Sequence, residues 1–307
     1  MTKITASLVK ELREKSGAGM MDCKKALAEH KGDMEAAMDY LRKKGLASAA
    51  KKSGRAAADG LVGVAAQGVS AVAVELNAET DFVARNEQFQ AMLTKVTELA
   101  LKNEIDDVEK LKAASLGAKT VEATLTDLIA TIGENMSLRR MKALAVKQGV
   151  VATYVHNALA PNLGKIGVLI GLESSAPADK LAELGRQLAM HVAAARPESL
   201  DVASLDKDIV ARERAIYADK SKQSGKPAEI VEKMVEGSLR KFYEQAVLLE
   251  QVFVIDGQTK ISAVLEKASK DLGAPVRLAG YVRYELGEGV EKKEDDFASE
   301  VAKMAAG

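Results

Sequence analysis

LVGVAAQGVSAVAVELN, residues 61–77, is the stretch that decides the fold, because the spacing of apolar residues changes there. Upstream, apolar residues recur at intervals of three and four, which is typical of amphipathic helices. Within the stretch, Val72, Val74 and Leu76 fall on one face of an alternating run, and a Gln67-Gly68 turn separates two such runs. We therefore expect an antiparallel hairpin and a chain of the α+β class.

Residues 1–45 predict a compact unit of three short helices. Thr5 is a candidate N-cap for the first helix and Asp33 for the third. We expect the third helix to end at Gly45, and the small and basic residues of 46–60 to form a linker. The core of such a unit is too thin for an enzyme.

The pattern of a hairpin followed by a helix recurs further along the chain. A helix carrying Phe89 follows the first hairpin, and a second helix is expected over 120–143. Residues 149–173 then predict another hairpin, and 179–197 another helix. We interpret this as a structural pseudo-repeat, which predicts two α+β cores with antiparallel sheets.

The last third of the chain predicts a helix pair, a strand and a final helix. Residues 205–245 suit two antiparallel helices joined at SGKP, 224–227. VRLAGYVRYELG, 276–287, alternates as an antiparallel strand does and is expected to join the second sheet. The final helix carries an apolar stripe of Phe297, Val301 and Met304.

The composition limits the classes of partner. Lys and Arg number 44, and so do Asp and Glu, so the net charge is zero and we expect no direct nucleic-acid partner. No apolar run approaches the roughly 18 residues of a membrane span, and the N-terminus lacks the layout of a secretory signal. The single cysteine, Cys23, fits a reducing compartment. We therefore expect a cytoplasmic protein that does not bind membranes.

None of the common motifs of an active site, a cofactor site or a metal site stands out. GAG at 17–19 is not followed by the Gly-Lys-Ser/Thr of a phosphate loop. His30, His156 and His191 lie far apart, without the short spacings of zinc ligands. We expect no catalytic residues, no metal and no cofactor.

The stretch NAETDFVARNEQF, residues 77–89, contains Phe82, and the residue pattern does not decide whether its side chain is buried or exposed. Thr80 and Asn86 compete as caps of the next helix. If the helix begins at Thr80, Phe82 shares the buried face of Phe89; if it begins at Asn86, Phe82 projects from a tight turn. The residue pattern leaves both interpretations open.

Several motifs in this chain resemble bacterial elongation factor Ts, in the family's order and across nearly the whole chain. They are SLVKELREKSGAGMMDCKKAL (7–27), ETDFVARN (79–86), TIGENMSLRR (131–140), SGKPAEIVEKMVEG (224–237) and GEGVEKKEDDFASEV (287–301). Residues 103–124 match loosely, and the loop of the second hairpin looks longer than the family's. Neither difference touches ETDFVARN.

The resemblance implies a division of the chain into modules. The expected parts are an N-terminal three-helix module similar to ubiquitin-associated domains with its linker (1–54), a core subdomain N (55–148), a core subdomain C (149–195 and 246–286), an inserted antiparallel helical hairpin (196–245) and a C-terminal helical module (287–307).

The resemblance also implies a function, that of a nucleotide exchange factor without a chemical active site of its own. Members bind elongation factor Tu with GDP, displace its Mg²⁺ and promote GDP release, so that GTP can bind during translation elongation. The family's motif carries over to Thr80, Asp81, Phe82 and Val83, and with it the exposed interpretation of Phe82 leads.

Further contacts with the partner are expected, because one buried Phe contributes roughly 1.5 to 3 kcal/mol, or about 10- to 100-fold. The candidates are Arg13, Met20 and Met21 in the first module, by resemblance, and Tyr154 and His156 in the second hairpin. The alternatives are that the two Met belong to the core and that His156 is an ordinary hairpin residue. A homodimer through the helical hairpin is a further expectation.

Overall fold

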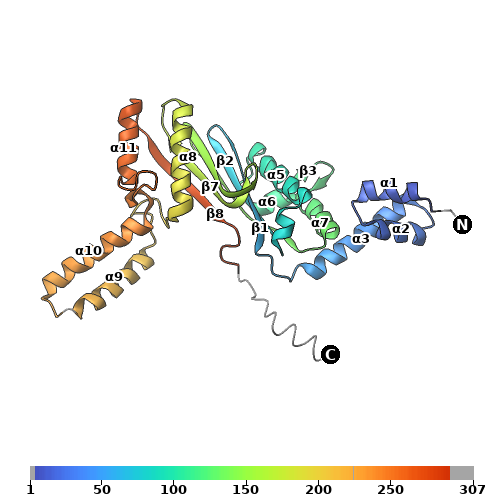
Figure 1. Ribbon diagram of the computed structural model, residues 1–307, viewed down its shortest axis with the longest axis horizontal. Coiled ribbons are helices and arrows are strands. Elements are labelled where there is room, and N and C mark those ends of the chain that lie inside the picture. Colours follow the sequence, from blue (N-terminus) through green and yellow to red (C-terminus); the bar gives the residue numbers. More distant parts are fainter. Residues whose placement is uncertain (1–3, 224, 291–307) are drawn as a thin grey trace.

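The computed structural model describes residues 4–223 and 225–290, and its chain is elongated (Figure 1). A helical bundle lies at one end, a sheet with its covering helices in the middle, and a pair of long helices at the other end. The predicted final helix with Phe297, Val301 and Met304 lies outside the described residues.

The N-terminal bundle consists of α1 (Ala6–Ser16), α2 (Met20–Glu29) and α3 (Met34–Lys52). Both predicted caps are confirmed: Thr5 Oγ1 accepts a hydrogen bond from the Leu8 N–H at 3.3 Å, and Asp33 Oδ1 accepts one from the Ala36 N–H at 3.0 Å. Leu12 and Leu27 are fully buried where the helices meet. The bundle therefore has a small apolar core of its own.

Helix α3 continues seven residues past Gly45, so the predicted helix end and the start of the predicted linker are wrong. Gly45 lies where α3 meets α7 (Val121–Ile132), and a Cβ on it would be 3.1 Å from the Cβ of Ala130. Ala49 packs against the core beneath α7. This glycine permits a close approach of two helices; it does not end one.

Six strands form an antiparallel sheet in the order β5-β2-β1-β7-β6, and β8 also pairs with β7. The strands are β1 (Asp59–Gln67), β2 (Ser70–Ala78), β5 (Met136–Ala145), β6 (Gly149–Ala160), β7 (Leu163–Glu173) and β8 (Arg277–Glu285). Both predicted hairpins are present, and β8 joins the second as expected. The two expected sheets are continuous, since Val62 and Gly63 of β1 pair with Gly164 and Leu163 of β7.

Residues 133–143 were expected to continue a helix, and this prediction is wrong. Helix α7 ends at Ile132, because Gly133 adopts the left-handed conformation with φ of 94°. Strand β5 follows, and its pairing with β2 shifts register near Arg139. The resulting bulge moves the buried face from Leu138 to Met141, a spacing of three that looks helical in the sequence.

Each half of the sheet has its own apolar core. In the first half, β1 and β2 pack against α5 (Glu87–Lys102), α6 (Val108–Ala113) and α7. In the second half, β7 packs against α8 (Ala178–Ala195) and α11 (Ile261–Leu272), a helix that the sequence analysis missed. A third cluster, with Val64, Leu169 and Val282, joins strands of both halves. A short ladder of β3 (Ser115–Leu116) and β4 (Lys119–Thr120) precedes α7.

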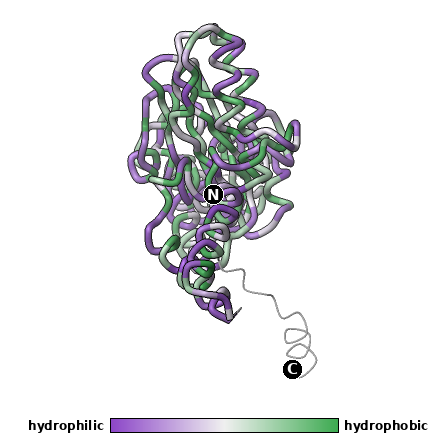
Figure 2. The backbone as a smooth tube through the Cα atoms, turned by 90° about the vertical axis from the view of Figure 1, so that its left-hand side faces the viewer, coloured by the Kyte–Doolittle hydropathy of each residue, from purple (hydrophilic) through white to green (hydrophobic). Residues whose placement is uncertain are grey.

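The long helices α9 (Lys207–Lys222) and α10 (Ala228–Ala246) pack side by side and extend from the second half (Figure 1). Arg214 of α9 joins Glu232 of α10 at 3.1 Å and also contacts Glu236. A single 3₁₀ turn, Leu248–Glu250, leads back to the core. Among the described helices none is both long and apolar enough to cross a membrane, and Figure 2 shows hydrophilic and hydrophobic residues interleaved along the chain.

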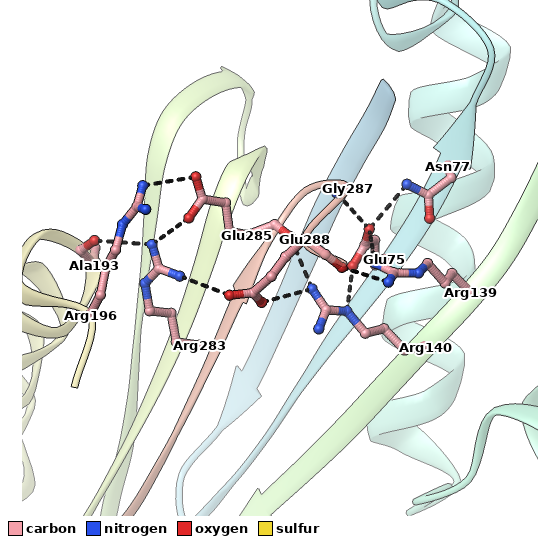
Figure 3. Close-up of polar contacts among 10 residues, drawn as sticks. All are labelled: Glu75, Asn77, Arg139, Arg140, Ala193, Arg196, Arg283, Glu285, Gly287 and Glu288. Carbon is pink, nitrogen blue, oxygen red and sulfur yellow. Dashed lines mark hydrogen bonds and ion pairs between the residues drawn. The ribbon is translucent and has the colours of Figure 1, made fainter. Parts of the chain in front are cut away.

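A fully buried carboxylate, that of Glu75 on β2, lies between the first half of the sheet and the segment after β8 (Figure 3). It accepts hydrogen bonds from Asn77 Nδ2 at 3.0 Å, Arg139 Nη1 at 3.1 Å, Arg140 Nε at 2.5 Å and the Gly287 N–H at 2.9 Å. Burial alone would raise the pKa of Glu75, but the hydrogen bonds from Gly287, Arg140 and Asn77 and the charge of Arg140 hold it below its ordinary value.

The network continues from this carboxylate into the second half. Glu288 accepts from Arg140 Nη2 at 3.3 Å and lies 3.8 Å from Arg283 Nη1. Arg283 and Arg196 both donate to Glu285, at 2.8 and 3.0 Å (Figure 3). Charged groups thus connect β2 and β5 to β8 and the end of α8.

Replacing Glu75 by Gln is expected to lower the free energy of unfolding by roughly 3 kcal/mol at neutral pH, because two arginines lose their buried counter-charge. Since the folded-state pKa is lowered, the carboxylate stabilises the fold above about pH 4.3, and this contribution is lost as the pH falls through the folded-state pKa. Urea denaturation at neutral pH and at about pH 3 measures both effects. The difference between wild type and variant should shrink at the lower pH.

The matched control is Glu109→Gln, because Glu109 forms an exposed ion pair with Lys112. It should change stability by less than about 0.5 kcal/mol. An equally small effect of Glu75→Gln would contradict a stabilising role of the network.

Candidate partner-binding site

Both candidate positions within residues 77–89 precede a helix, but only the Asn86 side chain makes a capping hydrogen bond. Thr80 precedes a single helical turn, α4 (Asp81–Ala84), and Asn86 begins α5. Asn86 Oδ1 accepts hydrogen bonds from the Gln88 and Phe89 N–H groups at 2.9 and 3.3 Å. The break between the two helices means that Phe82 and Phe89 do not share a helix face.

Phe82 projects into solvent with 79 % of its surface exposed, whereas Phe89 is fully buried. The exposed interpretation of Phe82 is therefore confirmed, and the core interpretation is wrong. Asp81 beside it is also exposed. Val83 is only 4 % exposed and packs with Ala84 in the first core. Helix α4 thus presents Asp81 and Phe82 outward and is attached through Val83 and Ala84.

Thr80 is held by a carboxylate that lies 54 residues further along the chain. Its N–H donates to Glu134 Oε2 at 3.0 Å, and its hydroxyl donates to Glu134 Oε1 at 2.8 Å. In the neighbouring pair, Glu79 Oε1 accepts from the Asn135 N–H at 2.5 Å. Glu134 lies within the motif TIGENMSLRR, but its contact with Thr80 is not predicted from the sequence, because no spacing rule connects positions so far apart.

The other predicted contact residues form two further patches. Arg13, Met20 and Met21 lie at the surface of the bundle, and the two Met are 58 % and 75 % exposed, so the core alternative is wrong for them. Tyr154 and His156 lie together on β6, with the Tyr154 hydroxyl 3.1 Å from His156 Nδ1. Tyr154 and His156 therefore lie together, whereas the predicted contact residues of the bundle, of α4 and of β6 lie on three separate surfaces.

His191 and Cys23 are buried side chains that hydrogen-bond within the protein. His191 is fully buried; its Nδ1 accepts from the Val254 N–H at 3.2 Å, its Nε2 lies 2.9 Å from Gln251 Oε1, and burial lowers its pKa. Cys23 is buried in the bundle, with its Sγ 3.6 Å from the Ala18 carbonyl. Within residues 4–223 and 225–290, no cluster of His, Cys, Asp and Glu could hold a metal ion.

Phe82, Met20 and Met21 are large apolar side chains exposed at the surface of an α+β scaffold, and exposed apolar side chains that gather on a surface are typical of proteins that bind other proteins. The family model described as Elongation factor TS matches residues 79–288, which begin at the Phe82 turn and end at Glu288. Proteins named Elongation factor Ts from Rhodospirillum centenum and Rhodospirillum rubrum are 63 % and 61 % identical to this chain. These alignments cover 99 % and 98 % of this chain and 100 % and 98 % of the relatives. The chain belongs to the elongation factor Ts family, as its motifs predict.

The two Phe residues are expected to differ sharply in their contribution to stability. Phe82→Ala should change the free energy of unfolding by less than about 0.5 kcal/mol, because the ring is solvated in the folded protein. Phe89→Ala should cost roughly 3 to 5 kcal/mol, because it leaves a cavity in the first core. Thermal and urea unfolding of both variants measure the difference. A large loss of stability in Phe82→Ala would show that its ring is buried in solution.

Proposed function

We propose that this protein is a guanine-nucleotide exchange factor of translation elongation, without a chemical active site of its own, and that it acts in the cytoplasm. Its partner is elongation factor Tu with bound GDP; it displaces the Mg²⁺ of that partner and promotes GDP release, so that GTP can bind. The observation that carries the proposal is the exposed ring of Phe82 on a turn that is attached to a rigid sheet.

The exposed ring suits a mechanism of insertion. GDP is held in a GTPase by contacts to its phosphates and by a Mg²⁺ ion that bridges phosphate and protein. An aromatic ring that enters beside the metal site shifts the elements that hold the ion and loosens the nucleotide. The factor binds the nucleotide-free partner more tightly than the nucleotide-bound one. Nucleotide must therefore lower the factor's affinity for the partner by the same ratio, and abundant GTP then releases the factor.

Of the four motif residues, Asp81 and Phe82 would contact the partner directly, since both are exposed. Val83 supports the motif from below, because it packs in the core. Thr80 is half-buried and hydrogen-bonded to Glu134, which suits a role in fixing the backbone.

The energy of one ring is too small to hold the partner, so the other patches supply affinity. Burial of the exposed Met20 and Met21, next to Arg13, would add apolar contact at the bundle. Tyr154 and His156 would add a contact from β6. In this proposal the bundle is the module similar to ubiquitin-associated domains, and the division at 1–54, 55–148, 149–195 with 246–286, 196–245 and 287–307 describes the functional parts.

The exchange function is tested by the release of fluorescent GDP from elongation factor Tu with and without this protein. Wild-type protein should accelerate release, and Phe82→Ala should lower the acceleration roughly 10- to 100-fold. The matched control is Val202→Ala, an exposed apolar residue in a loop before α9. An unchanged rate with wild-type protein would refute the function, and an equal effect of both variants would refute the role of Phe82.

We also propose that α9 and α10 pair two copies of the chain. Ile209, Ile216 and Ile230 are between 37 % and 48 % exposed on these helices, which is costly unless another surface covers them. Sedimentation velocity should show a dimer that Ile216→Asp dissociates and that Asp219→Asn leaves intact. A monomeric wild-type protein would exclude this arrangement.

A further inference from the structure

Helix α4 is too short to hold its own orientation. It has four residues, and the entropy lost in forming a first helical turn is not repaid within so short a helix. Thr80, at its N-cap position, makes no side-chain capping bond, and its hydroxyl donates to Glu134. Of its four residues, Val83 and Ala84 are buried in the first core. The direction in which Phe82 points must therefore be fixed by contacts outside the helix.

Those contacts continue the ladder of β2 and β5 beyond its last pair, Ala78 with Met136. Past this pair, side-chain carboxylates replace the backbone carbonyls as acceptors. Glu134 accepts the Thr80 N–H, and Glu79 accepts the Asn135 N–H, so each segment supplies a carboxylate for the backbone of the other. Hydrogen bonds to ionised carboxylates are about twice as strong as neutral ones. We call this pair of contacts the carboxylate brace.

The brace is fixed on its far side by the segment between α3 and β1. Asn135 is almost fully buried, and its Nδ2 donates to the Arg55 carbonyl at 2.7 Å. The Arg55 guanidinium lies 3.4 Å from Glu79 Oε1. Glu79 and Asn135 thus contact each other and also contact Arg55. Glu134 contacts Thr80, the residue that precedes α4.

We propose that Glu134 is a positioning residue for Phe82, an inference that rests on the proposed exchange function. Glu134 holds Thr80 by two hydrogen bonds, one from the backbone N–H and one from the side-chain hydroxyl, and so sets the direction in which α4 leaves the sheet. Without it, α4 frays, and the ring must be ordered at the moment of insertion. That ordering costs binding free energy and slows exchange.

The test is a double-mutant cycle on GDP release from elongation factor Tu. Glu134→Ala should lower the acceleration about tenfold, whereas Glu122→Ala, a matched exposed glutamate in the first turn of α7, should leave it within twofold. Phe82→Ala combined with Glu134→Ala should be no slower than Phe82→Ala alone, because the brace acts through the ring. Additive losses, or an unchanged rate in Glu134→Ala, would overturn the proposal.

Hydrogen exchange separates a failure of this inference from a failure of the proposed function. The Arg85 and Asn86 N–H groups donate to the carbonyls of Phe82 and Val83 at 3.2 and 2.9 Å. Glu134→Ala should speed exchange of these amides and of Thr80, and leave the amides of α5 unchanged. Unchanged protection at Thr80, Arg85 and Asn86 would overturn the brace. If wild-type protein does not accelerate GDP release, the function fails even where these amides respond.

Discussion

The buried carboxylate of Glu75 is the interaction on which the arrangement of the two halves depends. The described strands of the two halves share two residue pairs, between β1 and β7, and the apolar cluster with Val64, Leu169 and Val282 adds contacts between them. Glu75 adds Arg139 and Arg140 from β5 and the Gly287 N–H from beyond β8, and Glu288 extends the links to Arg283. Burial of a carboxylate is unfavourable by itself, and these donors offset that cost.

The elements that sequence analysis predicted well are those with local signals. Thr5 and Asp33 cap helices as expected, and alternation found both hairpins and β8. The errors arose where a distant contact decides the structure. Gly45 resembles a helix end, yet α7 packs against it and the helix continues. The bulge near Arg139 gave β5 a spacing that looks helical, because the residue pattern does not reveal which strand will pair with it.

The candidate site was predictable in part. Competing caps left Phe82 undecided, and the family resemblance favoured exposure, which the structure confirms. Glu134 could not be assigned by pattern, because its contact with Thr80 exists only after β2 and β5 have paired. Val83 belongs to the motif by resemblance, but its side chain points into the core. A sequence motif consists of residues that are adjacent along the chain. The fold decides which of these residues are exposed to a partner and which pack in the core beneath them.

The length of α3 has a consequence for how tightly a partner is held. Helix α3 runs unbroken from the bundle to its contact with α7, and α7 leads directly through Gly133 to Glu134, so packed elements connect the bundle to α4 without interruption. In the proposed function, the bundle and α4 contact the same partner and would act as a bivalent ligand: once the first surface binds, the second meets its target at a high effective concentration. Such avidity would give tight binding from two weak contacts, and the partner would dissociate quickly once either contact is lost.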